Sequence, residues 1–319
     1  MLLAAALTVP LHAQVVPNDA IVDGRTLPEW TAEWWKWMLP IPPDQNPHLD
    51  PDGSFAHVRQ PEGSVFFLAG VFGLSPGTVT RTFTVPEDKF LLMPVLEVVW
   101  NNIDTVPPLP VEQLLDFAAG VVQNPRELHA VVDGVPVPDL LQRRVTAPVF
   151  SIAFPDTDNI FTWIAGHSIT GLVDPNVADG YWLMLQPLPV GQHVLHYGGT
   201  YADPFFFPND IVANITVVPV PLPERVAELI AQVNQSNLPL HRRRALLATL
   251  DAARHSFASG RLLPGINQLH AFQNQVRAQV VRNDQALAYS LVEAAQRIIA
   301  RAASRLNHSG KVSAKGGTP

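Results

Sequence analysis

The chain has 319 residues, 47% of them hydrophobic and 15% charged, which fits two folded domains and excludes a disordered protein. Its net charge of −7 is uneven: residues 14–223 carry 8 basic and 23 acidic side chains, whereas residues 224–305 carry 11 arginines and 5 acids. The acidic part has no surplus of Lys and Arg for phosphates, so we expect no nucleic-acid binding. Cysteine is absent, which excludes disulfides and thiol chemistry. No apolar run reaches the roughly 18 residues of a membrane helix, so we expect no membrane span.

Residues 1–13 are mostly apolar and end in the small residue Ala13, as secretory signal segments do. This pattern predicts cleavage after Ala13, a mature chain that begins at Gln14, and a secreted protein in the extracellular or periplasmic space. The positively charged start of such signals is missing. Two alternatives therefore stay open: the true start lies upstream, or the segment is a buried N-terminal element.

A capping-box pattern with proline in the first turn begins at Thr26 and predicts a helix over residues 27–38. At 100° per residue, three of its tryptophans share one face: Trp30, Trp34 and Trp37. We interpret these three as core residues rather than as a ligand platform. Trp35 lies at the edge of their stripe and is the candidate ligand-binding ring of this helix.

Beyond this helix the hydrophobic period falls to two. Residues 78–85 alternate threonines with mostly apolar side chains, which predicts a half-buried strand, and Asp133-Gly134 is typical of a two-residue hairpin turn. Further strands are predicted at residues 64–69, 89–95, 148–154, 160–165, 181–186, 193–197 and 211–218. So many short strands, with Pro and Gly between them, predict a β-rich sandwich or jelly-roll domain over residues 14–218.

Several blocks of this domain resemble an uncharacterised family of secreted bacterial proteins with a Trp-Trp-x-Trp block. The likeness is carried by EWTAEWWKW at residues 29–37, VFFLAG at 65–70, TRTFTVP at 80–86 and DGYW at 179–182. It implies secretion and a β-rich domain, and it supplies no activity. Many proteins of this pattern carry cysteines where this chain has Ala56 and Phe83, so the disulfide that the resemblance implies is absent here.

Two acidic turns are candidate metal sites. Asp50 and Asp52 begin an Asp-x-Asp-Gly sequence, and Asp156 and Asp158 lie in a second oxygen-rich turn. Calcium prefers several carboxylate and carbonyl oxygens around a tight turn, so the four aspartates could hold this ion if they meet in space. The later acidic ligands of an EF-hand are missing, and plain Asx turns are the alternative. Calcium is the one cofactor that we consider, and the sequence otherwise indicates none.

His57 or His167 could join an acid such as Glu97 or Asp104 in a catalytic group, and an enzyme would need two or more of these side chains, or of Asp156 and Asp158, in one cleft. His193 and His196 lie three residues apart on a predicted strand, so they face opposite sides and cannot bind one ion together. The motifs of serine hydrolases, zinc proteases and phosphate-binding loops are absent. A glycosidase stays open, because its two carboxylates leave no short motif.

The Pro-rich residues 219–223 are interpreted as a linker, since 28 of the 31 prolines lie at or before residue 223. After it, four stretches have apolar residues at helical spacing, which predicts a small all-α helical bundle over residues 224–305. Residues 306–319 are expected to be a disordered tail. The two modules therefore differ in charge, composition and period.

The bundle sequence resembles the FIMAH domain, a C-terminal module of many secreted microbial hydrolases, peptidases and adhesin-like proteins. The likeness is carried by LIAQV at residues 229–233, LATLDAA at 247–253, INQLHAF at 266–272 and LVEAAQRII at 291–299. It extends over about residues 224–303. The resemblance implies secretion and an accessory role in interaction, and leaves any reaction open.

Arg242, Arg243 and Arg244 open the second helix of this module, either as a solvated face or as a patch for an acidic partner. That partner would be an extracellular polymer, an envelope component or the acidic first domain. We expect a secreted or envelope-associated, non-catalytic binding protein with exposed rings such as Trp35 or Trp182. The alternative is a secreted hydrolase that acts on glycans through carboxylates of the first domain.

Overall fold

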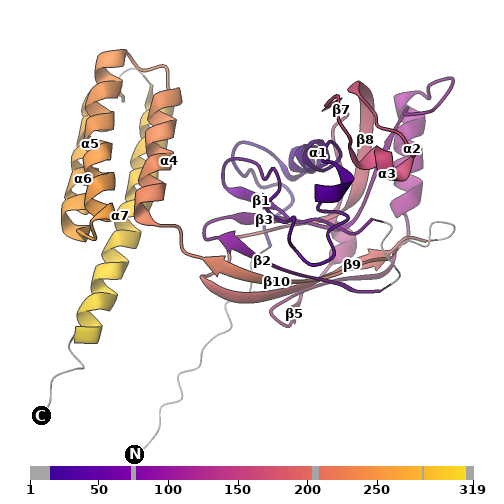
Figure 1. Cartoon of the computed structure of the whole chain (residues 1–319), viewed down its shortest axis with the longest axis horizontal. Coiled ribbons are helices and arrows are strands. Elements are labelled where there is room, and N and C mark those ends of the chain that lie inside the picture. Colours follow the sequence, from indigo (N-terminus) through magenta and orange to yellow (C-terminus); the bar gives the residue numbers. More distant parts are fainter. Residues whose placement is uncertain (1–14, 73–76, 203–207, 282–283, 314–319) are drawn as a thin grey trace, which may run out of the picture. The chain divides into compact units, whose positions relative to one another are not determined.

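The computed structural model describes residues 15–72, 77–202, 208–281 and 284–313, with side chains up to residue 306. The signal-like segment and its predicted cleavage site lie outside these residues. The chain divides into two compact units between Pro219 and Val220. We call the first, which holds every described strand, the β-rich unit, and the second, which holds four helices, the helical unit (Figure 1).

Two mixed sheets form the β-rich unit. In the first sheet the order is β1 (Val65–Phe67), β3 (Phe90–Asn101), β8 (Gly171–Leu185) and β6 (Arg144–Thr146), and β7 (Phe150–Phe154) also pairs with β8. In the second sheet the order is β2 (Val79–Pro86), β10 (Pro208–Val218), β9 (Gly191–Thr200), β4 (Arg126–Val132) and β5 (Val135–Pro136). The pairs β1–β3 and β2–β10 are parallel, whereas β3–β8 and β9–β10 are antiparallel.

The first sheet is covered on both faces. Helix α1 (Leu27–Met38) lies over one face, and the second sheet lies on the other side (Figure 1). Alternate residues of β3 serve the two cores: Leu92 packs with the tryptophans of α1, and Leu91 and Met93 pack with the second sheet. Burial on both faces explains why residues 90–96 are almost continuously apolar.

The second sheet is buried on one face only. Along β10, buried and partly exposed residues alternate from Asn209 onward, and the threonines of β2 are exposed while Arg81 and Val85 are buried. The predicted strand of residues 78–85 is therefore confirmed. The outer face of this sheet carries polar side chains.

The predicted helix over residues 27–38 is confirmed as α1. The Thr26 backbone NH and hydroxyl both donate to the Glu29 carboxylate, as in a capping box. The tryptophans that share one face are buried, as predicted, and the indole groups of Trp34 and Trp37 donate to the carbonyl oxygens of Leu68 and Val58. Helix α1 is thus held by hydrogen bonds as well as by packing.

Residues 160–165 are not the predicted strand, because residues 160–164 form the short helix α3 (Ile160–Ile164). The Asn159 side chain accepts a hydrogen bond from the Phe161 backbone NH and caps this helix. A short, mostly apolar and aromatic run fits either a strand or a helix, and only the cap distinguishes them. The sequence also gave no prediction for α2 (Val111–Val122), which packs against β3 and β8, or for the turns η1 (Pro43–Gln45) and η2 (Leu140–Arg143).

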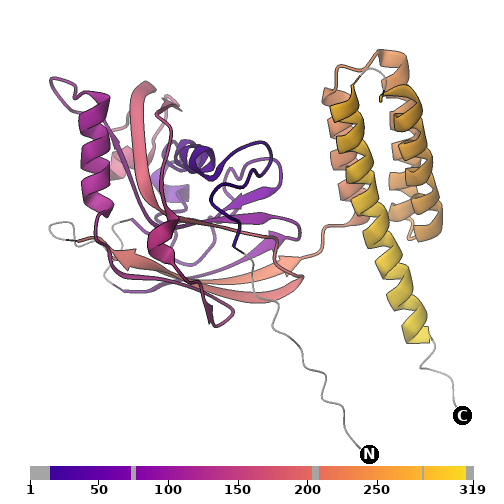
Figure 2. The ribbon, with the colours of Figure 1, turned by 180° about the vertical axis from the view of Figure 1, so that it is seen from behind.

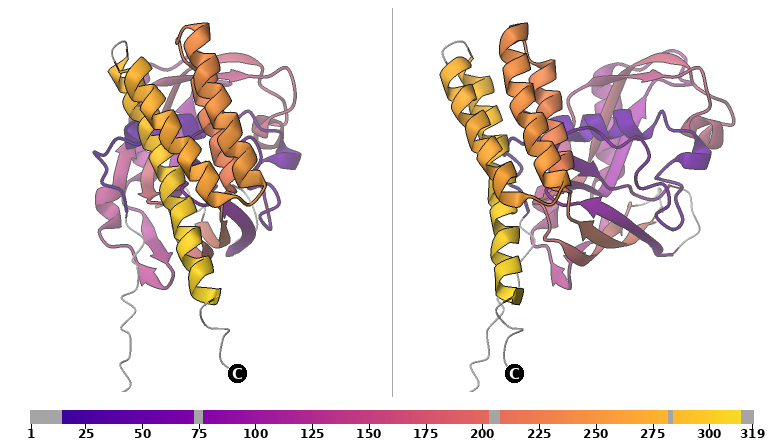
Figure 3. Two further views of the ribbon diagram at one scale, coloured as in Figure 1. Left: turned by 90° about the vertical axis from the view of Figure 1, so that its left-hand side faces the viewer. Right: turned by 60° about the vertical axis from the view of Figure 1, so that its left-hand side comes forward.

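The helical unit consists of α4 (Leu222–Gln235), α5 (Leu240–Ala258), α6 (Leu262–Gln279) and α7 (Gln285–Ser313). Each helix packs against two others, α4 and α7 included, around one apolar core (Figures 2 and 3). Asp284 accepts a hydrogen bond from the Leu287 backbone NH, as expected of a cap of α7. None of the described helices combines the length and apolar character needed to cross a membrane.

Two boundaries differ from the prediction. Pro223 lies in the first turn of α4, so the end of the predicted linker is helical, because proline is tolerated where a helix NH has no partner. Pro264 is tolerated in the first turn of α6 for the same reason. Helix α7 extends to Ser313, beyond the predicted end at residue 305, and residues 314–319 lie outside the description.

Candidate functional site

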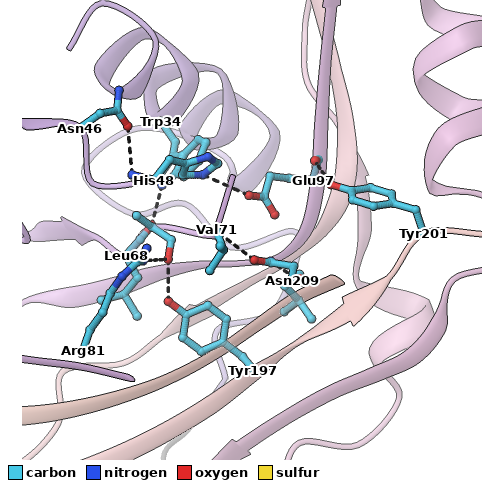
Figure 4. A network of polar contacts seen from close by, with 12 residues as sticks. Trp34, Asn46, His48, Leu68, Val71, Arg81, Glu97, Tyr197, Tyr201 and Asn209 are labelled. Atoms are coloured by element: carbon cyan, nitrogen blue, oxygen red, sulfur yellow. Dashed lines mark hydrogen bonds and ion pairs between the residues drawn. The ribbon is translucent and has the colours of Figure 1, made fainter. Parts of the chain in front are cut away.

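A cluster of polar side chains lies enclosed in the β-rich unit, next to α1 (Figure 4). At its centre are His48, Arg81 and Glu97, which are 2%, 3% and 6% exposed. Charged residue types are almost never fully buried unless they are paired. The cluster is therefore the most unusual chemical feature of the described fold.

His48 is positioned by the loop that follows α1. The Asn46 side-chain amide donates to the carbonyl oxygens of Met38 and Ile41, both at 3.0 Å, and its own oxygen accepts from the His48 backbone NH at 2.9 Å. The imidazole lies 5.1 Å from the Trp34 ring, centroid to centroid. The end of α1 thus fixes the histidine backbone, and the tryptophan packs against its ring.

Arg81 projects inward from β2. Its Nε donates to the Asp50 carbonyl oxygen at 2.9 Å and its Nη1 donates to the Ala69 carbonyl oxygen at 2.8 Å. The Tyr197 hydroxyl donates to the same Ala69 oxygen at 3.0 Å. Burial lowers the pKa of Arg81, opposed by nearby Tyr197 and acidic groups. The guanidinium therefore connects two loop segments to the second sheet.

Glu97 comes from β3, just after a register shift in its pairing with β8. Its Oε1 lies 3.3 Å from His48 Nε2, and the Tyr201 hydroxyl donates to its backbone oxygen at 2.5 Å. A Cβ atom at Gly70 would lie 2.4 Å from Glu97 Oε1, so only glycine leaves room for the carboxyl group. The VFFLAG block therefore ends in glycine for a steric reason.

Burial makes the His48–Glu97 pair neutral near pH 7. Desolvation, aided by the charge of Arg81, lowers the pKa of His48 to about 3. Desolvation raises the pKa of Glu97 to about 8, although Arg81 acts in the opposite direction. Both ring nitrogens of His48, together with Glu97 Oε2 and Arg81 Nη2, lack a partner with hydrogen-bond geometry. Buried polar atoms without a hydrogen-bond partner are energetically costly, and this cluster contains several of them.

The two tryptophans expected as exposed ligand-binding rings are buried. Trp35 is 4% exposed and Trp182 is 1% exposed. Their rings lie 4.9 Å and 5.2 Å from the Trp34 ring in edge-on contacts, so both belong to the core that α1 forms with the first sheet. The prediction of a surface role for these rings is wrong, because α1 is covered on a broader arc than its main tryptophan stripe and because Trp182 of β8 packs in the same core as the tryptophans of α1.

Two exposed aromatic rings lie close together: Phe72 and Trp163 are 39% and 46% exposed and 5.5 Å apart in an edge-to-face contact. All of residues 163–167 are exposed, and His167 Nε2 lies 3.0 Å from Asp104 Oδ2. This hydrogen bond raises the pKa of His167. We call Phe72, Trp163 and this His–Asp pair the aromatic patch. The sequence does not indicate the aromatic patch, because it predicts residues 160–165 as a strand.

The aromatic patch adjoins the buried cluster. The Phe72 ring is stacked on the His48 ring at 6.3 Å, with 24° between the planes, and the Phe72 backbone NH donates to the His48 carbonyl oxygen. Phe72 therefore separates the imidazole from the surface. In this arrangement the His48 and Glu97 side chains are each 3% exposed and cannot contact a solute.

Among the described residues, the predicted calcium ligands do not form a common group of acidic side chains. The Asp50 carboxylate accepts from the backbone NH groups of Asp52, Gly53 and Phe55, and Asp158 accepts from the Ser168 hydroxyl. The Asx turn, which was the alternative interpretation, thus describes the first acidic turn. The structure does not bring Asp52 or Asp156 into a shared group with them.

The four predicted catalytic side chains are divided among three places. Glu97 pairs with His48 and Asp104 pairs with His167, whereas His57 lies 3.3 Å from the Thr84 hydroxyl. Of the pairings between a histidine and an acid that the sequence left open, His167 with Asp104 is formed, whereas Glu97 and His57 lie elsewhere. Sequence reasoning missed His48 and Arg81, since nothing in their spacing marks them as partners of a residue on β3.

The three arginines that open α5 have different roles. Arg242 Nη1 donates to the Gln279 carbonyl oxygen at 2.9 Å, and Arg243 Nη1 donates to the Asn234 carbonyl oxygen at 3.0 Å. These oxygens lie at the C-terminal ends of α6 and α4, where carbonyl groups lack helical partners. Arg244 is exposed and stays a candidate interaction residue. The three therefore do not form a uniform solvated face.

We expect Arg242→Ala to destabilise the helical unit by about 1 kcal/mol, the usual value of one such hydrogen bond. Arg244→Ala should change stability by less than about 0.5 kcal/mol, as exposed substitutions do. All seven tryptophans lie in the β-rich unit, so tryptophan fluorescence does not report on unfolding of the helical unit. Far-UV circular dichroism measures that unfolding instead. Equal midpoints for the two variants would contradict the capping role.

No protein-family model, no curated protein sequence and no solved structure was found to match the chain.

Proposed function

We propose that this chain is a secreted or envelope-associated, non-catalytic binding protein whose β-rich unit binds an extracellular polymer through the aromatic patch. The observation that carries the proposal is the exposed pair of rings, Phe72 and Trp163. Exposed aromatic side chains in contact with each other are candidate interaction sites, because covering them removes apolar area from water.

The composition of the patch favours a saccharide polymer. A sugar ring has a C–H face that stacks on an aromatic ring and a rim of hydroxyl groups that need polar partners. His167, four residues along the chain from Trp163, and its hydrogen-bonded partner Asp104 provide such groups, and both side chains are half or more exposed. Asn159 caps the short helix that carries Trp163, which orders the backbone of this segment before a ligand binds.

We also propose an architecture for each of the two units. Two sheets packed over a shared core support a β-sandwich with α1 as a further layer, and the parallel strand pairs fit a jelly roll less well. For the helical unit, four helices around one core support an up-and-down bundle of the FIMAH type that serves as an accessory module. Secretion rests on the signal-like residues 1–13.

The test is binding of the purified full chain to peptidoglycan sacculi, cellulose and chitin in sedimentation assays. We expect Phe72→Ala and Trp163→Ala each to weaken binding to one of these polymers at least tenfold. Phe117→Ala is the matched control, because Phe117 is 49% exposed and stacks on a different ring, Trp100, at 5.9 Å. Unchanged binding in both patch variants, or an equal loss in the control, would refute the proposal.

A second surface is an alternative site for the same ligand. A groove of about 410 Å³ beside α1 is lined by Trp30 and Trp37 and by charged side chains that include Arg59 and Glu62. A charged rim over tryptophan edges could also bind a sugar. If Arg59→Glu abolishes polymer binding and the patch variants do not, the ligand site is this groove.

One observation favours the alternative, a secreted hydrolase that acts on glycans. A pKa of about 8 lets Glu97 keep its proton at neutral pH, as general acids of glycosidases do. Its enclosure beneath Phe72 opposes this role, because a general acid must reach the glycosidic oxygen. Release of reducing ends from the bound polymer, lost in Glu97→Gln, would establish the hydrolase and refute the non-catalytic proposal.

A further inference from the structure

The outer face of the second sheet carries a group of two histidines and one aspartate that the sequence does not indicate. Ligand atoms of His129, His196 and Asp210 all lie within 4.8 Å of one another. These residues come from the adjacent strands β4, β9 and β10. We propose that they form a binding site for a divalent transition-metal ion of the zinc class, independent of the aromatic patch.

Strand register explains why these three side chains meet. His129 on β4 and Asp210 on β10 both lie opposite Gly198 on β9, one on each side of it. Because Gly198 has no side chain, the imidazole and the carboxylate can lean toward each other over the central strand. A Cβ atom at Gly198 would lie 1.8 Å from the Asn209 carbonyl oxygen, so no other residue fits. His196, two residues before Gly198, is on the same face.

The alternation of side chains along β9 also explains why the sequence does not predict this metal site. His193 faces the other side, where it bonds to Asp133 and to the Pro189 carbonyl oxygen. The prediction that His193 and His196 cannot bind one ion together is consistent with this arrangement. The second histidine comes instead from a neighbouring strand, 67 residues earlier in the chain, and sequence spacing does not reveal it.

The hydrogen bonds fix which nitrogen of His129 faces the group. His129 Nδ1 lies 2.8 Å from the Glu127 carbonyl oxygen, which can only accept, so Nδ1 carries the proton. In the neutral ring, Nε2 then has its lone pair directed at Asp210 Oδ1, 3.2 Å away, and it has no hydrogen-bond partner. The same carboxylate oxygen accepts a hydrogen bond from His196 Nε2 at 2.8 Å, and a bound ion would take the place of that proton. The three ligand atoms thus converge where a cation would be shared.

The separations suit a tetrahedral ion. Metal–ligand distances of about 2.0–2.2 Å place two zinc ligands roughly 3.3 Å apart, close to the distances of 3.2 Å and 2.8 Å between the carboxylate oxygen and the two imidazoles. A small increase in these ligand–ligand distances would therefore make room for the ion. Two imidazoles and one carboxylate are ligands that zinc prefers, and calcium, which prefers oxygen ligands, is disfavoured.

Two of the three ligands also form a hydrogen bond to a group that does not face the ion, as metal ligands generally do. The Glu127 carbonyl oxygen holds the His129 ring, and the Thr78 hydroxyl donates to Asp210 Oδ2, the oxygen that does not face the histidines. Glycines and polar residues, including Gly77, Glu127 and Thr200, line a hollow of about 160 Å³ at Asp210. Three protein ligands and an adjoining hollow leave a fourth position for water or a ligand group.

The experiment titrates the full chain, without a histidine tag, with ZnCl₂ against a chromophoric chelator. We expect one saturable ion per chain and at least tenfold weaker binding in His129→Gln, His196→Gln and Asp210→Asn. Thr78→Val should weaken binding about 10- to 100-fold, the usual effect of removing such a supporting group. Co²⁺ in place of zinc should give the visible absorption of a tetrahedral site in the unaltered chain and lose it in His196→Gln.

The matched control is His193→Gln, which removes a histidine from the same strand that also pairs with an aspartate. It should leave zinc affinity and the cobalt spectrum unchanged. Thermal melts in EDTA show whether each variant is folded, and the ligand side chains are partly exposed, so conservative replacements fit. Absence of saturable binding, retained binding in all three ligand variants, or an equal loss in His193→Gln would overturn the proposal.

Discussion

Replacing Trp34 by alanine is expected to destabilise the β-rich unit by about 3–5 kcal/mol, the range for deletion of a large buried aromatic side chain. Trp34 is 0% exposed, and its ring contacts those of Trp35, Trp37, His48 and Trp182. Its indole also donates to the Leu68 carbonyl oxygen at 2.7 Å, which would lose that partner. The cost therefore combines a cavity with a buried, unpaired acceptor.

Urea denaturation followed by tryptophan fluorescence measures this effect in the full chain, since all the tryptophans report on the β-rich unit. Trp163→Ala is the control, because its ring is 46% exposed and its loss should cost less than about 0.5–1 kcal/mol. Trp34→Phe should fall between the two. Similar midpoints for Trp34→Ala and Trp163→Ala would show that the tryptophan block of α1 is not the centre of the core.

The parts of the fold that the sequence predicted well are those with a local signal. The capping box at Thr26 and the spacing of the tryptophans located α1 correctly, because helical period and cap act over a few residues. Residues 78–85 alternated clearly, since one face of the second sheet meets water. Residues 160–164 have no comparable period, and the Asn159 side chain decides their structure.

The buried cluster and the histidine group could not be predicted in the same way. His48, Arg81 and Glu97 come from a loop and from strands in two different sheets, and only the packing of these sheets brings them together. For His129 and Asp210, the decisive facts are strand order and the register at Gly198. Both are long-range pairings that no short motif records. Their separation along the chain makes them invisible to arguments from spacing.

The pH dependence of stability is expected to change with the ionisation of Glu97. Its pKa is raised from an ordinary value of 4.5 to about 8, mainly by burial. A raised pKa means that the folded state holds a proton that the unfolded state has released. Stability from this group is therefore complete below about pH 4.5 and is lost as the pH rises through about 8.

His48 contributes in the opposite sense. Its pKa is lowered from 6.5 to about 3, mainly by burial, so its contribution is complete above about pH 6.5 and is lost as the pH falls through about 3. Between pH 4.5 and 6.5 the two slopes offset each other. We therefore expect these two groups to produce a plateau in that range, with a decline on both sides.

The decline above pH 6.5 is the sharper test, because Glu97 alone of the pair acts there. Between pH 6.5 and 8 the β-rich unit should lose on the order of 2 kcal/mol, from 1.36 kcal/mol per pH unit. Glu97→Gln has nearly the same shape and cannot ionise, so over this interval it should lose about 2 kcal/mol less than the unaltered chain and be the more stable protein at pH 8. Urea midpoints by tryptophan fluorescence at several pH values measure both proteins. A parallel decline in Glu97→Gln would mean that Glu97 is not the group that holds the proton, and the neutral His48–Glu97 pair would have to be abandoned.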